Sequence, residues 1–186
     1  MAATSVKSPN DVVDFLIGQH QRIKGLFDET LSTSGPERDE AFVQLRRLLA
    51  VHETAEEEIV HPRARRELGD RHDIVEARLE EEHEAKTVLA ELEDLDIDSK
   101  KFTEQLSELR DAVLDHAEHE EQEEFSKLRQ DLSDDELERL TRTVKLAESI
   151  APTRPHAGVE SRVANLVAGP FAAMMDRARD AILGYS

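Results

Sequence analysis

The sequence contains no cysteine, which excludes disulfide bonds, thiolate zinc sites and iron–sulfur clusters held by cysteine. It also has no tryptophan, and aromatic residues make up only 4% of the chain, so extended β-structure is not expected. Glycine and proline are scarce, at seven and six of 186 residues, whereas strong helix formers are abundant. This composition predicts an all-α protein.

Long apolar runs are missing as well. No stretch reaches the length of a membrane-spanning helix, and the first residues lack the hydrophobic region of a signal peptide. The formal charge of −18 would repel nucleic-acid phosphates and anionic membrane surfaces. We therefore expect a cytoplasmic protein that binds neither nucleic acid nor membrane. Cations bound by some of the carboxylates would make the net charge less negative.

The most informative feature that is present is a spacing that occurs twice. Each half of the first 131 residues carries one lone histidine. A second histidine follows it 32 or 33 residues later, with a glutamate four positions further on. Residues four apart lie on the same face of a helix. The six residues in this repeat are His20, His52, Glu56, His83, His116 and Glu120.

Apolar residues at steps of three and four predict five helices, and the six polar residues interrupt the apolar faces of the first four. The expected helices cover residues 9–33, 37–67, 73–94, 99–131 and 134–150, the last opened by a capping box at Ser133 and Glu136. Prolines at 152 and 155 end that helix, and Pro170 suits the start of a further one. We expect residues 1–131 to form a bundle. Residues 132–186 should form a helical extension that packs on the bundle or on a partner chain.

A polar group on a buried face costs several kcal/mol unless it is satisfied. A single buried histidine can be satisfied by hydrogen bonds, but six residues in a duplicated register are better explained by metal coordination. Imidazole and carboxylate ligands suit iron, manganese or zinc. Facing helices of a four-helix bundle can place two carboxylates between two ions, with histidines at the terminal positions.

Other histidines and glutamates compete for these roles. The pattern Leu-Arg-x-x-x-x-x-His-x-x-x-Glu appears twice, which favours His116 and Glu120 over the alternative pair His119 and Glu123. His119 could instead orient a ligand. His61 lies about 140° around an α-helix from Glu56, so a surface or helix-end position is the simpler interpretation. A solvated helix face is the simpler interpretation for Glu53, Glu57, Glu121 and Glu124.

These motifs resemble the hemerythrin-like, His-His-Glu cation-binding family over roughly residues 10–131. The matching segments are His20–Ile23, His52–Glu57 leading to Val60–Pro62, Glu82-His83, and His116–Glu121. The resemblance implies an up-down four-helix bundle with a non-haem di-iron centre. It implies as ligands His20, His52, Glu56, His83, His116 and Glu120.

The chain departs from oxygen-carrying hemerythrins. Those proteins look to have two histidines four apart on the third helix. Here the positions four away from His83 are Leu79 and Thr87, and neither can replace an imidazole. One iron would then have an open position or would recruit Glu53 or His61. An open position disfavours simple oxygen carriage and favours reactions of peroxide, oxygen or nitric oxide at the metals.

Two functions follow from this interpretation. The first is a di-iron protein that binds or reacts with oxygen, peroxide or nitric oxide, with catalase-like activity if it consumes peroxide. The second is a non-enzymatic iron or oxygen sensor, or an iron-binding module, with the C-terminal segment as its interaction element. Zinc or manganese would fit less well than two iron ions, and either a monomer or a homodimer is expected. A ferritin-like iron oxidase is disfavoured because that class uses Glu-x-x-His.

Overall fold

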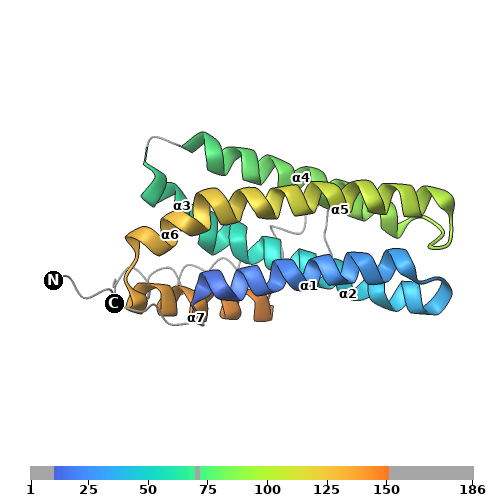
Figure 1. Ribbon diagram of the computed structural model, residues 1–186, viewed down its shortest axis with the longest axis horizontal. Coiled ribbons are helices and arrows are strands. Elements are labelled where there is room, and N and C mark those ends of the chain that lie inside the picture. The colour runs from blue at the N-terminus through green and yellow to red at the C-terminus, as the bar shows by residue number, and fades with distance from the viewer. Residues whose placement is uncertain (1–10, 70–71, 151–186) are drawn as a thin grey trace, which may run out of the picture.

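The computed structural model describes residues 11–69 and 72–150, and within these ranges every regular element is a helix (Figure 1). Four long helical segments run alternately up and down, and a fifth helix lies beside them. The segments are α1 (Val12–Ser32); α2 (Gly35–Ala55) continued by η1 (Glu56–Val60) and α3 (His61–Leu68); α4 (His72–Glu93); α5 (Lys100–Glu120) continued by η2 (Glu121–Phe125) and α6 (Ser126–Asp131); and α7 (Asp134–Ile150). The predicted all-α, up-down four-helix bundle with an additional helix is confirmed.

Local signals in the sequence account for the helix boundaries. The side chain of Asp11 accepts a hydrogen bond from the Asp14 N–H at 2.9 Å and caps α1, and Ser99 caps α5 in the same way. Gly35 begins α2 with a φ of 59°, a left-handed conformation that favours glycine. Its N–H donates to Asp98 at 2.9 Å, so the α1–α2 and α4–α5 turns lie at the same end of the bundle (Figure 1).

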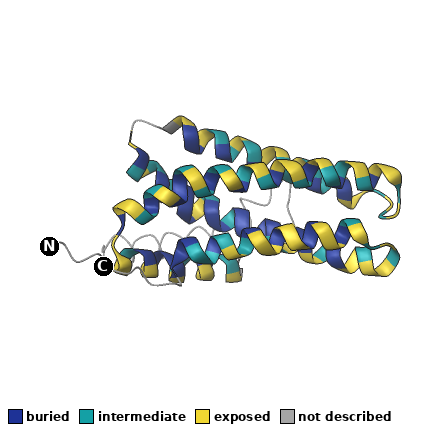
Figure 2. Ribbon diagram, in the orientation of Figure 1, coloured by how far each residue is buried: buried dark blue, intermediate teal, exposed yellow. Residues whose placement is uncertain are grey.

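The core of the bundle consists of two apolar clusters. The first cluster contains Leu16, Ala55, Val75 and Phe125, and the second contains Ile23, Leu49, Leu89 and Val113 among others. Along each of the four helical segments, buried polar residues lie between the members of one cluster and those of the other. A polar layer therefore crosses the middle of the bundle, with an apolar layer on each side. Figure 2 shows the buried positions facing the interior along all four segments.

The helix α7 packs against the first apolar cluster through Leu137, Leu140, Val144 and Ala147. The predicted capping box is confirmed, because the Glu136 carboxylate accepts hydrogen bonds from the N–H (3.0 Å) and hydroxyl (2.7 Å) of Ser133. The further helix predicted from Pro170 lies outside the described residues. Among the described helices, none combines the length and apolar character that crossing a membrane requires.

The packing of α7 can be tested with two leucines of the same helix. Leu140 is 4% exposed, whereas Leu146 is 46% exposed. We expect Leu140→Ala to lower the free energy of unfolding by about 2–5 kcal/mol, because it leaves a cavity in the core. The matched control Leu146→Ala should change it by less than about 0.5 kcal/mol. Urea denaturation followed by circular dichroism measures both, and equal effects would show that α7 is not part of the folded core.

Candidate metal centre

Buried imidazoles and carboxylates from all four segments meet in the polar layer. Two groups can each hold a cation, with ligand atoms within 4.8 Å of one another. His20 and His52 belong to one group and Glu82 and His116 to the other, and both groups include Glu56 and Glu120. A third group joins His61 to Glu120 and Glu124.

The two oxygens of Glu120 face different histidines. Its Oε2 lies 3.4 Å from Nε2 of His20, and its Oε1 lies 3.5 Å from Nε2 of His116. Glu56 accompanies the first group, with Oε2 at 3.1 Å from Nε2 of His52. The carboxylate of Glu120 therefore lies between the two groups, in the position of a bridging ligand.

The other ring nitrogen of each histidine already has a partner. Nδ1 lies 2.8–2.9 Å from an acceptor in every case: Glu121 for His20, Gln19 for His52, Glu124 for His61 and Glu81 for His116. Hydrogen bonds of this kind fix the orientation and tautomer of metal-binding histidines. In His20, His52 and His116 the other nitrogen, Nε2, is therefore left facing the shared carboxylates of Glu56 and Glu120. His61 differs because its Nε2 also lies 2.6 Å from Glu82.

The hydrogen bond at His52 extends to α7. The Gln19 amide accepts from His52 Nδ1 at 2.8 Å and donates to the Glu148 carboxylate at 2.7 Å. Because an amide cannot exchange these two roles without rotating, Glu148 helps to set which face of Gln19 meets the histidine. The helix outside the four-helix bundle thus contributes to the position of a candidate ligand.

Several atoms in the polar layer are buried without any hydrogen-bond partner in the described part of the chain. They are Nε2 of His20 and His116, both carboxylate oxygens of Glu56 and of Glu120, and Oε2 of Glu82. An unsatisfied buried charge costs several kcal/mol, so this arrangement is unfavourable on its own. Cations among these atoms would satisfy them together. The nitrogen and oxygen donors fit iron, manganese or zinc.

The electrostatics of the layer point the same way. Burial raises the pKa of Glu56 well above its usual value, with a further contribution from the charge of Glu120, and burial raises the pKa of Glu82 to about 7. Burial would also raise the pKa of Glu120, but the charge of His116 holds it well below its usual value. Burial would lower the pKa of His116, yet Glu120 raises it to about 9. Without a metal, the carboxylates are thus balanced by protons.

His61 supplies positive charge beside the buried carboxylates of Glu82 and Glu124. Burial would lower the pKa of its imidazole, but hydrogen bonds to Glu124 and Glu82 raise it well above the usual value. The ring is 1% exposed and lies between the two carboxylates. A metal that took over Glu82 would therefore also remove a proton from His61.

The π-helix η1 explains why an α-helical projection placed His61 at the surface. The His61 N–H donates to the Glu56 carbonyl, five residues earlier, so the helix widens by one residue and turns His61 into the polar layer. The structure thereby brings His61 to the candidate ligands. The π-helix η2 follows Glu120 in the same manner and contains buried Glu124, whose Oε2 lies 2.9 Å from Nδ1 of His61. Phe125, also in η2, stacks on the ring of His20 with centroids 5.6 Å apart.

His83 is a correction to the sequence prediction. Its side chain is exposed, and buried Glu82 holds the equivalent place on α4. The prediction followed repeated steps of four from Val75, and each such step drifts by about 40° on a helix of 3.6 residues per turn. The buried side of α4 instead follows Val75, Arg78, Glu82 and Leu89. The buried leucines late in this helix were the available signal for the correct face.

Of the glutamates expected on solvated helix faces, two are partly exposed in the structure and two are buried. Glu121 accepts from His20 at the edge of the layer, and Glu57 pairs with Lys86. Glu53 is buried and lies outside the groups that can hold a cation, while Glu124 is inside one. His119 pairs with Asp115 at 3.8 Å and is 43% exposed, so it does not orient any of the four buried histidines.

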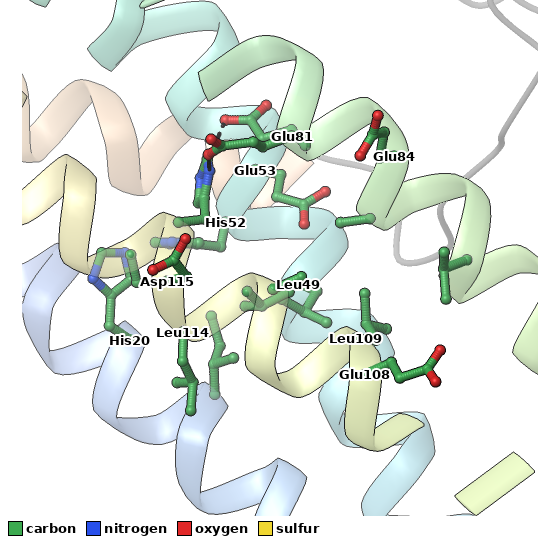
Figure 3. Close-up of a pocket in the computed structure, with 18 of the residues that line it drawn as sticks. His20, Leu49, His52, Glu53, Glu81, Glu84, Glu108, Leu109, Leu114 and Asp115 are labelled. Atoms are coloured by element: carbon green, nitrogen blue, oxygen red, sulfur yellow. Dashed lines mark hydrogen bonds and ion pairs between the residues drawn. The ribbon is translucent and has the colours of Figure 1, made fainter. Parts of the chain in front are cut away.

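A cavity of about 350 Å³ adjoins the polar layer between α1, α2, α4 and α5 (Figure 3). His20, His52, Glu82 and His116 form part of its wall. Most of the remaining wall is apolar and includes Ile23, Leu49, Val88, Leu109 and Val113. A small molecule in this cavity would reach the candidate metal ligands through apolar surroundings.

The sequence pattern of the hemerythrin HHE cation-binding domain matches residues 11–128. The chain belongs to this family. In three dimensions it is similar to a hemerythrin HHE cation-binding domain-containing protein from Mycobacterium kansasii, with a TM-score of 0.66 and 18% identity. The match covers 75% of this chain and 86% of that one.

Two relatives in other organisms extend the comparison. A DNA nickase of Nostoc sp. is 28% identical over 146 residues, and an uncharacterized hemerythrin-like protein of Schizosaccharomyces pombe is 28% identical over 134 residues. The matches cover 78% and 71% of this chain, but only 41% of the nickase and 66% of the yeast protein. The chain therefore spans less than half of the nickase and about two thirds of the yeast protein.

The pKa values predict how metal binding depends on pH. Glu82, with a pKa of about 7, and Glu56, whose pKa is also raised, must lose protons before they can ligate a cation. His116, with a pKa of about 9, must lose its proton as well. Affinity should therefore begin to fall as the pH drops below about 9 and fall more steeply below about 7, by roughly tenfold per pH unit for each proton displaced. Calorimetric titration with Mn²⁺ in buffers of different ionisation enthalpy measures both the affinity and the released protons. A pH-independent affinity between pH 6 and 8 would contradict this assignment.

Proposed function

We propose that this hemerythrin HHE protein holds two non-haem iron ions and binds or reacts with oxygen, peroxide or nitric oxide. The observation that carries the proposal is the set of buried, unpartnered ligand atoms beside an apolar cavity. His20 and His52 would hold one ion, and Glu82 and His116 would hold the other, with His61 beside them in a third group with Glu120 and Glu124. Glu56 and Glu120 would lie between the two ions.

Bound iron would supply the redox and Lewis-acid chemistry, and the protein would supply its surroundings. The three carboxylates Glu56, Glu82 and Glu120 bring more negative charge than neutral imidazoles would, which favours a more highly charged, oxidised metal. The apolar wall excludes bulk water and leaves room for a small reactant. These features support reaction with an oxidant over simple reversible oxygen carriage.

Three buried histidines of this set are predicted to be required for metal binding, and His83 serves as a matched control. We expect about two iron ions per chain in the wild type and fewer in His52→Ala, His61→Ala and His116→Ala. His83→Ala should bind as much iron as the wild type, because its side chain is exposed. Metal analysis after anaerobic loading with Fe²⁺ and gel filtration gives the numbers. A wild type without metal, or a loss confined to His83→Ala, would refute the assignment.

Catalase-like activity is the form of this function that is simplest to test. The iron-loaded protein should evolve oxygen from hydrogen peroxide with many turnovers per iron pair, as an oxygen electrode can record. A protein that reacts once and then stops would instead be a non-enzymatic sensor or iron-binding module. In that case a single spectral change without continued gas evolution is the expected record.

The relationship to a DNA nickase suggests a second activity, the metal-dependent cleavage of a DNA strand. The charge of −18 disfavours approach to DNA phosphates, and the match covers only 41% of the nickase. We therefore expect the same iron-loaded sample to leave supercoiled plasmid intact. Conversion of plasmid to the open circular form by the wild type but not by His116→Ala would favour the nickase activity instead.

A further inference from the structure

Glu53 is a buried acidic residue of the cavity wall that belongs to none of the groups of candidate metal ligands. It follows His52 on α2 and is 5% exposed. Its Oε2 is buried and has no hydrogen-bond partner in the described chain. In Figure 3 its carboxylate extends into the space between α2 and α4. An unsatisfied carboxylate at this position calls for a ligand that is not always present.

Acidic residues also surround the outer part of the same cavity. Glu84 on α4 and Glu108 and Asp115 on α5 line it and are exposed to solvent (Figure 3). A cleft lined by one sign of charge concentrates ions of the opposite sign and raises their rate of entry. Lys86 is the nearby positive charge, but its ammonium pairs with Glu57, and the residue is not part of the wall.

The carboxylates thus form a sequence from the surface to the polar layer. Exposed acids lie at the outer wall, Glu53 lies within the cavity, and Glu82 belongs both to the wall and to a group of candidate ligands. A hydrated divalent cation must exchange its water for protein oxygens before it reaches the histidines, and carboxylates are suitable intermediate ligands. Apart from these acids and the candidate histidine ligands, the wall also includes Glu81, which already pairs with His116 and Arg78, and Gln105, and the rest of it is apolar.

We propose that this cavity is the route by which a divalent cation enters the metal centre, with Glu53 as its transient ligand. The inference rests on the proposed function only in that the centre is the destination of the cation. Glu53 on this view is not a resident ligand. Its removal should slow loading without changing the amount of metal finally bound.

Loading can be followed without any enzymatic activity by the visible absorption of Co²⁺, mixed with the metal-free full-length chain in a stopped-flow instrument. We expect Glu53→Gln, which keeps the shape and replaces the carboxylate ligand by an amide, to slow loading by about tenfold. The double variant Glu84→Gln with Glu108→Gln should slow it several-fold and weaken its dependence on salt. The control Glu40→Gln, an exposed acid of α2 outside the cavity wall, should load like the wild type.

The outcomes separate this inference from the proposed function. If the wild type takes up neither Co²⁺ nor Fe²⁺, the metal centre itself is wrong. If the wild type loads and Glu53→Gln loads equally fast, only the entry route is refuted. A Glu53→Gln variant that binds less metal at equilibrium would refute it too, because Glu53 would then be a resident ligand. If Glu53→Gln fails to fold, the double variant Glu84→Gln with Glu108→Gln tests the entry route instead. An unchanged loading rate in that double variant would overturn the proposal.

Discussion

The structure depends on one electrostatic constraint, namely three carboxylates buried in the middle of a helical bundle. Glu56, Glu82 and Glu120 are each at most 1% exposed, and five of their six oxygens have no hydrogen-bond partner in the described chain. Such a layer would be replaced by apolar residues if stability alone mattered. The apolar clusters on both sides supply the packing energy that keeps the helices together across it. The bundle therefore stabilises a layer of buried groups that could hold cations.

The two π-helices are the second device on which this site depends. Each follows a His-x-x-x-Glu pair and adds one residue to a helical turn. His61, five residues after Glu56, and Phe125, five residues after Glu120, are both buried as a result. A π-helix has poorer backbone geometry than an α-helix and occurs mostly where function requires it. The duplicated spacing of ligands is thus accompanied by a duplicated deformation of the backbone. Sequence and backbone agree that the two halves of the bundle are built alike around the centre.

This pairing also explains which features the sequence revealed and which it concealed. His52, Glu56, His116 and Glu120 were predictable because their spacing of four fits a regular helix. His61 could not be placed, because the π-helix η1 changes the angle between residues that a regular projection assumes. Glu124 could have been placed, because it lies four residues after Glu120 and so on the same face of a regular helix. His83 was misplaced for a simpler reason: adjacent Glu82 is equally polar, and the face of α4 is decided by Leu89 and Leu92 two turns later. Regular periodicity therefore predicted the fold well and the site only where the helices stay regular.

The helix α7 shows how a segment outside the matched domain becomes part of the centre. Its apolar side completes the first cluster, which contains Ala55 and Phe125 next to the ligands. Its polar side reaches the same place through Glu148, which holds the Gln19 amide, and Gln19 holds His52. Any displacement of α7 would therefore change the hydrogen bonding of a candidate ligand and the packing behind it together. The position of the candidate ligand His52 thus depends on a helix that begins at Asp134, after the residues 11–128 that carry the family pattern.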